Sequence, residues 1–173
     1  MSDIDVIALY QGIMHRALRL ETRQRYAVPW EEAGLAAWRR GDPEPVTPQM
    51  ERTIETLRLV NESGRRIGRV RFVELPLTEY SQHEFEVAYP RNTAAGEEIH
   101  VLDRALHPEF DHVRDDFVVF DEDAVLWYRY TDEDVLTGYD YTEEPKVVRD
   151  CVALAEEVRA AAVPYREFIA RIR

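Results

Sequence analysis

The order of secondary structure is clearest in residues 67–102, whose sequence is IGRVRFVELPLTEYSQHEFEVAYPRNTAAGEEIHVL. Arg69 and Arg71 alternate with apolar residues near the start, and this alternation predicts a strand over residues 67–75 with one solvated face. The segment that follows predicts a helix, and residues 99–102 predict a second strand. Because a helix joins the two strands, they are expected to be parallel, in a right-handed βαβ crossover.

The helix of this crossover is predicted to begin after Thr78, which suits an N-cap because its hydroxyl can accept a bond from a free backbone N–H. Its large apolar residues are aromatic and include Tyr80, Phe85 and Tyr89. Pro90 has no backbone N–H to donate, so the helix is expected to kink or restart there before the chain enters the second strand.

Residues 1–64 are predicted to be mainly helical, because apolar residues recur there at helical spacing and the segment contains several helix start and stop signals. The predicted landmarks, in chain order, are an N-cap at Ser2 or Asp3, a short extended piece in residues 17–28, a helix start at Pro29, and a third helix from Thr47 to Gly64.

The chain after the crossover predicts an antiparallel meander followed by helices. Residues 117–120 are apolar on both faces, which indicates a central strand. Residues 124–130 and 135–141 are the other two strands, each preceded by a short polar turn. A long helix is predicted over residues 142–162, and Pro164 separates it from a last short helix.

Together these elements predict an α/β fold, with α+β as the alternative. Helices from the N-terminal part (residues 1–64) and the C-terminal part (142–173) are expected to pack on a mixed sheet formed by residues 65–141. The chain has 173 residues and no linker-like interior segment, so a single domain is expected. A single cysteine excludes an internal disulfide, and no cofactor or metal motif is recognised.

The net charge of −12 is unevenly distributed, because residues 73–144 carry 20 acidic and four basic side chains. Such a surface repels phosphate backbones, which argues against direct binding of nucleic acid. Arg65, Arg66, Arg69 and Arg71 form the one basic candidate, and an exposed strand face is the favoured interpretation of them. The acidic N-terminus and the absence of a long apolar run predict a soluble cytoplasmic protein without a membrane partner.

Several side chains are candidates for chemistry, and each has a structural alternative. His107, Asp111 and His112, with His100 nearby, could form a metal site, although an ordinary surface loop is favoured. Glu84 belongs to an acidic group that also contains Glu79, Glu86, Glu97 and Glu98 and is mostly expected in solvent.

Cys151 is expected to be a core thiol rather than a nucleophile, because it lies on the apolar stripe of the long helix. The aromatic cluster of the meander could stack bases, but packing within the sheet is the favoured interpretation. Its members are Trp127, Tyr128, Tyr130, Tyr139 and Tyr141.

Two stretches carry a family resemblance: residues 17–28 (ALRLETRQRYAV) and residues 69–102 (RVRFVELPLTEYSQHEFEVAYPRNTAAGEEIHVL). With residues 116–121 (DFVVFD) and 161–168 (AAVPYREF), they make the chain similar to an uncharacterised domain family of high-GC Gram-positive (actinobacterial) bacteria. That family is typically encoded beside helix-turn-helix regulators. The positions that match its recurrent motifs are Arg19, Glu21, Tyr26, Pro76, Leu77, Thr78, Tyr80, Glu84, Asn92, Gly96 and Glu97.

The order of elements also resembles one half of a phospholipase-D-like fold, whose His-x-Lys-x-x-x-x-Asp motif attacks phosphorus with the His and holds phosphate with the Lys. The stretch that aligns here is residues 114–121 (RDDFVVFD), and only Asp121 agrees. Arg114 stands in place of the nucleophile and Asp116 in place of the Lys, where it would repel phosphate. The resemblance therefore implies that phosphodiester chemistry is lost and that at most a pocket remains.

We therefore expect a non-catalytic binding or regulatory module of the transcription-regulation type, which acts with a helix-turn-helix protein or senses a small ligand. The expected ligand- or partner-binding residues are Arg19, Glu21, Tyr26, Tyr80, Glu84 and Asn92. For Arg19 and Glu21, internal bonds that tie the N-terminal segment to the sheet are an equal alternative. The competing function is a small hydrolase or nuclease of toxin type that uses Glu84 and His83, or a site of His107, Asp111 and His112.

Overall fold

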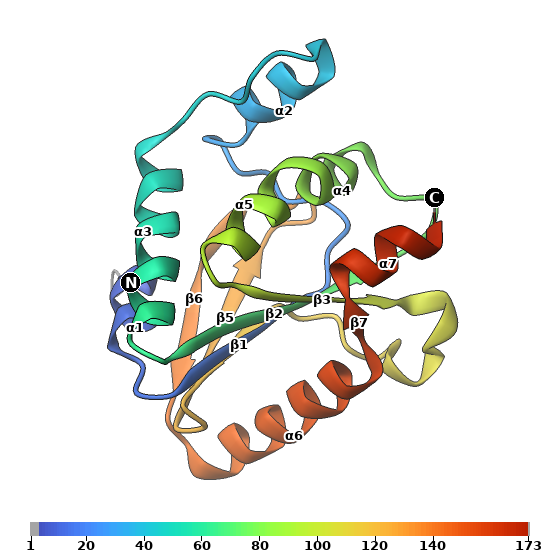
Figure 1. The fold of residues 1–173 in the computed structure, drawn as a ribbon. Helices are drawn as coiled ribbons and strands as arrows, with labels where there is room; N and C mark the ends of the chain where they lie inside the picture. Colours follow the sequence, from blue (N-terminus) through green and yellow to red (C-terminus); the bar gives the residue numbers. More distant parts are fainter. Residues whose placement is uncertain (1–3, 173) are drawn as a thin grey trace.

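The computed structural model describes residues 4–172 and contains an open seven-stranded mixed sheet with helices on both faces (Figure 1). The strand order is β6-β5-β4-β1-β2-β3-β7. Parallel pairing joins β1 to β2 and β2 to β3, whereas the other neighbours are antiparallel. The strands are β1 (Arg16–Glu21), β2 (Arg66–Val73), β3 (Glu98–Asp103), β4 (Phe117–Phe120), β5 (Ala124–Tyr130), β6 (Leu136–Thr142) and β7 (Val163–Pro164).

The helices divide between the two faces of the sheet. In Figure 1, α3, α4 and α5 lie over one face and α6 lies over the other. The helices are α1 (Val6–Gly12), α2 (Glu32–Arg40), α3 (Pro48–Glu62), α4 (Glu79–His83), α5 (Tyr89–Ala94), α6 (Pro145–Ala161) and α7 (Tyr165–Ile172). Among the described residues, none of these helices is long and apolar enough to cross a membrane.

The predicted fold class is confirmed, and so are its two main components. The crossover strands β2 and β3 are parallel and joined through α4 and α5. The apolar strand β4 lies inside the sheet between β1 and β5, and β4, β5 and β6 form the antiparallel meander. A strand that is covered on both faces needs apolar residues on both, which is why the continuous run in β4 marks its position.

The N-terminal part departs most from expectation, because it supplies a central strand as well as helices. The extended piece is β1, which lies between β4 and β2. The predicted caps Ser2 and Asp3 lie outside the described residues, and Asp5 caps α1 by accepting a bond from the backbone N–H of Ala8. Pro29 lies in a turn, and α2 begins only at Glu32.

The helix of the crossover is interrupted before Pro90, as its sequence predicts. Thr78 caps α4 by accepting a bond from the N–H of Ser81. Residues Glu84–Ala88 then form a π-helical turn, and α5 begins at Tyr89. Pro90 lacks the N–H that would continue the α-helical ladder, and the widened turn carries the chain past this gap.

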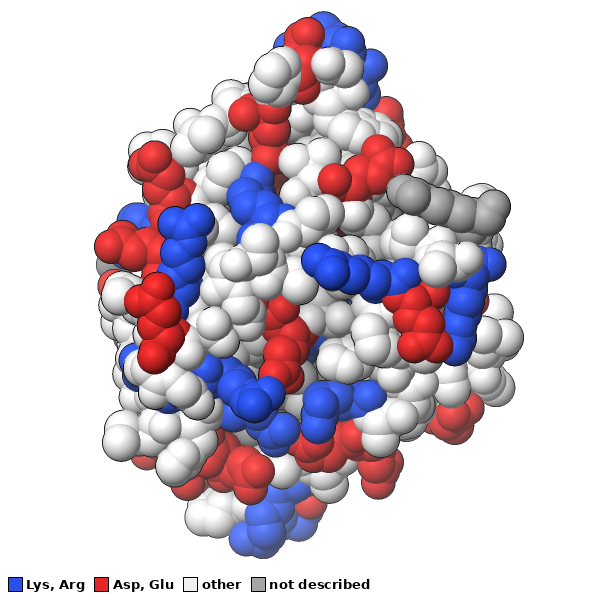
Figure 2. Space-filling view, in the orientation of Figure 1, with Lys and Arg blue, Asp and Glu red and all other residues white. Residues whose placement is uncertain are grey.

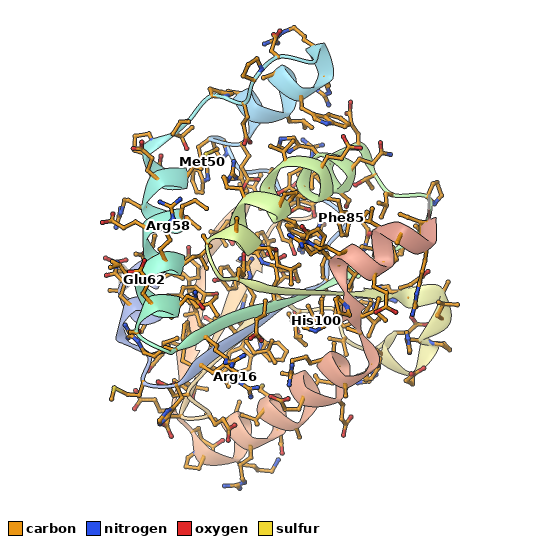
Figure 3. All side chains as sticks on the ribbon, viewed as in Figure 1. Arg16, Met50, Arg58, Glu62, Phe85 and His100 are labelled. Carbon is orange, nitrogen blue, oxygen red and sulfur yellow. The ribbon has the colours of Figure 1, made fainter. Side chains whose placement is uncertain are left out.

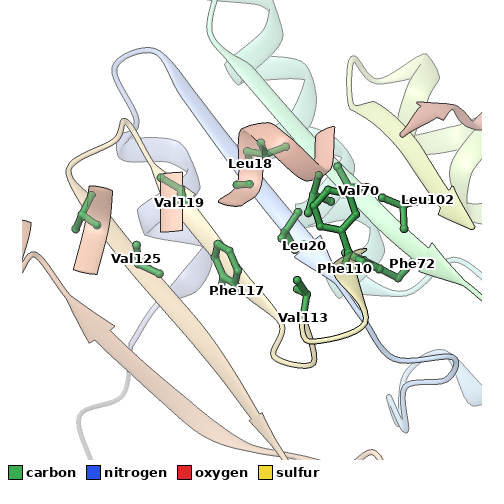
Figure 4. Close-up of a cluster of buried hydrophobic side chains, with 13 residues drawn as sticks. Leu18, Leu20, Val70, Phe72, Leu102, Phe110, Val113, Phe117, Val119 and Val125 are labelled. Carbon is green, nitrogen blue, oxygen red and sulfur yellow. The ribbon is translucent and has the colours of Figure 1, made fainter. Parts of the chain in front are cut away.

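Apolar clusters lie on both faces of the sheet. On one face of the sheet, α6 covers an apolar cluster that includes Leu18, Leu20, Val70 and Phe72 (Figure 4). On the opposite face, one apolar cluster lies under α1 and α3 and another lies against α5 and α7. In the second of these, Phe85 stacks on Phe168 of α7 with ring centroids 5.7 Å apart. Between the two clusters of this second face, the residues of β1 and β2 are charged: Arg19, Glu21, Arg69 and Arg71.

Candidate functional site

Strands β1 and β2 direct a set of charged side chains toward α3, α4 and α5. Alternation along a strand places Arg19 and Glu21 on the same face, and Arg69 and Arg71 on the same face of the next strand. The expectation that Arg69 and Arg71 face solvent is wrong, since Arg71 is 0% exposed. The helices of the crossover cover this face, and buried carboxylates compensate the guanidinium charges.

Glu21 is the carboxylate that joins the three arginines. Nη1 of Arg69 donates to both oxygens of Glu21, at 3.1 Å each, and Nη1 of Arg19 lies 3.1 Å from Glu21 Oε1. Arg71 is more distant, with Nη1 3.8 Å from Oε2. Burial alone would raise the pKa of Glu21, but Arg69, Arg19 and Arg71 outweigh it and lower the pKa to about 2.

Asp116 anchors the segment that follows β1. It accepts bonds from the backbone N–H and the hydroxyl of Thr22, at 2.7 and 2.8 Å, and from the hydroxyl of Tyr26 at 2.5 Å. Nη2 of Arg19 lies 3.8 Å from it. The backbone carbonyl of Arg114 accepts from the Thr22 hydroxyl as well. Arg114 and Asp116, which belong to the aligned 114–121 stretch, therefore both hold the segment after β1 in place.

Asp121, the position that agrees with the phospholipase-D-like pattern, also has a structural role. Its carboxylate accepts bonds from three consecutive backbone N–H groups, those of Met14, His15 and Arg16, at 2.6 to 2.9 Å. These bonds fasten the entry of β1 to the turn after β4.

Arg71 and Glu84 form a second buried contact. Nη2 of Arg71 lies 2.9 Å from Oε2 of Glu84, and the guanidinium carbon lies 4.8 Å from the centroid of the Tyr26 ring. Neither the three Arg71 nitrogens nor Glu84 Oε2 has a hydrogen-bond partner among the described residues. Burial raises the pKa of Glu84 to about 8 despite the opposing effect of Arg71, and Glu21 and Glu31 raise it further.

The carboxyl group of Glu31 lies opposite these strands, in the turn before α2. The hydroxyl of Tyr80 donates to Glu31 Oε2 at 2.7 Å. Burial raises the pKa of Glu31, although the bond from Tyr80 opposes this effect. At the other end of the crossover, Asn92 donates to Glu97 Oε2 at 2.9 Å, and Arg69 Nε donates to Glu97 Oε1 at 2.6 Å.

Many of these side chains line a polar cavity of about 240 Å³, whereas Arg71, Glu97 and Asp116 lie behind its wall. Those that line it are Arg19, Glu21, Tyr26, Glu31, Arg69, Tyr80, Glu84 and Asn92. Its walls come from β1, β2, α3, the crossover helices and the turn before α2. Met50, labelled at the start of α3 in Figure 3, lies on its rim. Outside the cavity, acidic and basic side chains are interspersed over the face of the molecule that Figure 2 shows.

The structure brings all six predicted binding residues to this cavity. Arg19 and Glu21 come from β1, Tyr26 follows β1, and the other three belong to the crossover; the latter are Tyr80, Glu84 and Asn92. Arg19 and Glu21 also form ion pairs within the protein, which is the structural role given above as the alternative for these two residues. Sequence reasoning missed Arg69 and Glu31. A crossover strand with parallel neighbours is covered on both faces, and this signal could have indicated that arginines on β2 are buried.

The loop with three candidate metal ligands does not assemble them. Nδ1 of His107 lies 3.1 Å from Glu109 Oε1, and Nδ1 of His112 lies 3.0 Å from the Glu109 carbonyl oxygen. Within residues 4–172, no three His, Cys, Asp or Glu side chains come together in a group able to hold a metal ion. The structure therefore gives no support to a metal site here.

The remaining candidates have structural roles. Arg65 donates to the carbonyls of Gln11 and Ile13, and Arg66 pairs with Glu98 at 2.5 Å. The arginines of the basic candidate therefore each bond to a different part of the protein. In the meander, the rings of Tyr128 and Tyr139 pack edge to face, 5.3 Å apart.

Cys151 is half-buried against the apolar cluster under α6. Burial raises the pKa of its thiol. A raised pKa keeps the sulfur protonated, which supports the prediction of a core thiol over that of a nucleophile.

The acidic group around Glu84 does not lie in solvent as a whole. Glu84 and Glu97 are buried in the site just described. Glu79 is exposed and pairs with Arg39 at 2.5 Å, and Glu86 accepts a bond from the indole of Trp38 at 2.9 Å. The expectation of a solvated face is therefore wrong for the two carboxyl groups that lie on the sheet side of the crossover.

The fold and the site define an α/β protein that holds a buried charge network beside a polar cavity. A family model described as a domain of unknown function, DUF6879, matches residues 5–170, and the chain belongs to this family. The match includes every residue of the site. A search of the curated proteins found no match.

Proposed function

We propose that this protein is a non-catalytic binding module that takes a small polar ligand into the cavity between β1, β2, α3 and the crossover helices. The observation that carries the proposal is that side chains from five separate parts of the chain converge on one cavity and leave buried polar atoms without partners there. A buried polar atom without a partner costs about 1–3 kcal/mol. Such a cost is tolerated where a ligand supplies the missing bond.

Asn92 illustrates this requirement. Its amide nitrogen donates to Glu97, whereas its carbonyl oxygen is buried and has no partner among the described residues. The oxygen belongs to a side chain that lines the cavity. A ligand with a hydrogen-bond donor would satisfy it.

Ligand binding is tested by calorimetry and thermal unfolding with a panel of small cationic, anionic and neutral polar compounds. We expect one charge class to bind, and Asn92→Ala to weaken that binding at least tenfold. Glu79→Gln is the matched control, because Glu79 lies on the same crossover but points to solvent. Failure of every charge class to bind would contradict the proposal.

A helix-turn-helix regulator is the proposed partner, on the strength of the resemblance to a family encoded beside such proteins. The 20 acidic residues of positions 73–144 would favour a basic partner surface. Co-purification of the two proteins at low ionic strength, weakened by salt, is the expected result. A complex insensitive to salt, or none at all, would argue against this partner.

One observation favours the competing function, a small hydrolase. Glu84 is a buried carboxyl group beside a cavity, and its pKa of about 8 suits a general acid near neutral pH. His83 is a weaker candidate, because its Nε2 faces Glu44 Oε1 at 3.4 Å and its ring packs on Trp38. Turnover of a bound compound that is abolished in Glu84→Gln, with binding retained, would replace the binding module by an enzyme.

A further inference from the structure

The ligand class can be inferred from the charges around the cavity, and this inference rests on the proposed binding function. Three guanidinium groups lie on the strand side: Arg19, Arg69 and Arg71. Three carboxylates are close enough to match them, and all three are nearly inaccessible to solvent: Glu21, Glu97 and Asp116. The strand side of the site is therefore balanced without a ligand.

Two further carboxyl groups line the cavity, and they bring the number of carboxyl groups around the three guanidinium groups to five. Glu31 contacts the hydroxyl of Tyr80, and Glu84 contacts Arg71, which also faces Glu21. The side chain of Glu84 is 10% exposed, and its Oε2 lacks a hydrogen-bond partner within the described chain. If both groups were ionised, five carboxylates would face three guanidinium groups, because Arg71 is shared by Glu84 and Glu21. Such an excess of negative charge is unfavourable in a poorly solvated site.

The basic residue at the rim does not supply the missing charge. Arg91 lines the cavity, but its guanidinium is paired with Glu44, which also faces His83. An anionic ligand would therefore meet two carboxyl groups and only guanidinium groups that already have carboxylate partners.

Aromatic rings form much of the remaining wall. The aromatic residues that line the cavity are Tyr26, Tyr80, Tyr89, Tyr130 and Trp30. The four tyrosine rings already attract cations of the protein itself: Arg71 lies over Tyr26 and Tyr80, Arg69 over Tyr89 and Arg23 over Tyr130. The face of an aromatic ring carries partial negative charge and attracts cations, by about 0.5–2 kcal/mol for each contact. Carboxyl groups combined with aromatic faces are the chemistry by which proteins recognise ammonium and guanidinium groups.

We propose that the ligand is a small organic cation, an amine or a guanidine, whose positive charge is balanced by Glu84 and Glu31 and whose carbon chain lies against the tyrosine rings. Binding then couples to a proton. In the free protein Glu84 holds a proton at neutral pH, because burial raises its pKa to about 8. The cation takes the place of this proton, which leaves to solvent.

The charged groups around Glu84 determine whether its proton can be exchanged for the cation. The titratable and charged groups that face it are Glu21 on β1, Arg69 and Arg71 on β2, Glu31 before α2, Tyr80 on α4 and Tyr89 on α5. Burial raises the pKa of both tyrosines far above the neutral range, and the arginines stay charged. Glu84, with a pKa of about 8, is thus the group in this set that can exchange a proton near neutral pH.

The test is calorimetric titration of the whole protein with putrescine, agmatine and choline, and with succinate, phosphate and glucose as probes of other charge. Repeating each titration in buffers of different ionisation enthalpy measures the protons released. We expect an amine or guanidine probe to bind and to release up to one proton from Glu84. Because the cation replaces this proton, the Kd should rise by up to about tenfold for each unit by which the pH falls below the pKa of Glu84.

Glu84→Gln removes the titrating group and keeps its shape, so this variant should fold, weaken the cation at least tenfold and abolish the pH dependence. Glu79→Gln should bind as the unaltered protein does. If circular dichroism shows that Glu84→Gln is unfolded, the proton count of the unaltered protein decides the question. Binding of succinate, phosphate or glucose in preference to the cations overturns the ligand class but leaves the binding function standing. Cation binding without proton release overturns the exchange of the cation for the proton of Glu84. No binding by any probe contradicts both.

Discussion

Strands β1 and β2 present two different surfaces to the helices that cover them. Toward α6, Leu18, Leu20, Val70 and Phe72 join an apolar cluster. Toward the crossover helices, the same strands direct charged residues, of which Glu21 and Arg71 are buried and Arg19 and Arg69 are partly exposed. The adjacent residues Leu20 and Glu21 are therefore both buried, Leu20 among apolar side chains and Glu21 among charged ones.

The difference teaches that the two faces contribute unequally to the stability of the fold. Burial of apolar area stabilises a protein by about 25 cal/mol per Å². Buried ion pairs seldom do better than apolar residues of the same size, because desolvation offsets their attraction. A network of arginines and carboxylates on one face consequently stabilises the fold less than an apolar face would, and this cost is one ground for the binding function that we propose for the cavity beside it.

The largest expected effect comes from removing the carboxylate that the arginines share. Glu21→Ala should lower the free energy of unfolding by about 3–5 kcal/mol, because Arg69 and Arg19 lose their common partner inside the protein. Urea denaturation followed by circular dichroism measures this loss. Glu98→Ala is the control: Glu98 pairs with Arg66 near the surface, where such pairs contribute about 0–1 kcal/mol. Equal losses in the two variants would refute the dependence on burial.

The neighbouring position probes the apolar face. Leu20→Ala should cost about 2–5 kcal/mol, through lost burial and a cavity under α6. Unlike changes on the charged face, this loss should be the same at every pH at which the protein is folded, and binding of the ligand should be unaffected. A loss that varies with pH, measured by the same urea titrations, would mean that the two faces are not energetically separate.

The charged face should also give the protein an acidic optimum of stability. Glu21 has a folded pKa of about 2, below its ordinary value of 4.5, so its contribution is lost as the pH falls through this interval. Glu84 has a folded pKa of about 8, above the same ordinary value, so the folded state loses stability as the pH rises from 4.5 to 8.

Unfolding titrations from acidic to mildly alkaline pH should therefore show a maximum near pH 4.5, where the two intervals meet. Glu84→Gln should retain the rise on the acidic side and reduce the fall on the alkaline side. A fall of the same size in this variant would show that another group is responsible for it.

The smallest effect is expected at Cys151. Its thiol is half-buried at the margin of the apolar cluster, so Cys151→Ala should change stability by about 1 kcal/mol or less. Burial raises the pKa of the thiol, so alkylation by iodoacetamide should be slow in the folded protein and rapid in urea. Fast alkylation of the folded protein would indicate a thiolate and reopen a chemical role for this face.

The elements of the fold could largely be predicted, because hydrophobic spacing and cap residues are local properties. The crossover, the buried strand β4 and the meander all follow from such patterns. The position of β1 could not be read in the same way, since residues 16–21 pair with β2 and β4, which come some 45 and 95 residues later in the chain. The six predicted binding residues share one cavity, but their partner Glu31 lies in a turn without a recognisable pattern.

The sequence by itself determined which side chains share a face of each strand, because alternation with a period of two is a property of the extended backbone. It also determined where the crossover helix is interrupted, through Pro90. Only the tertiary structure decided what covers each face. Arg69 and Arg71 show the same alternation whether water or a helix lies above them. Contacts between distant segments, here β2 with Glu21, Glu84 and Glu97, made that face a buried site.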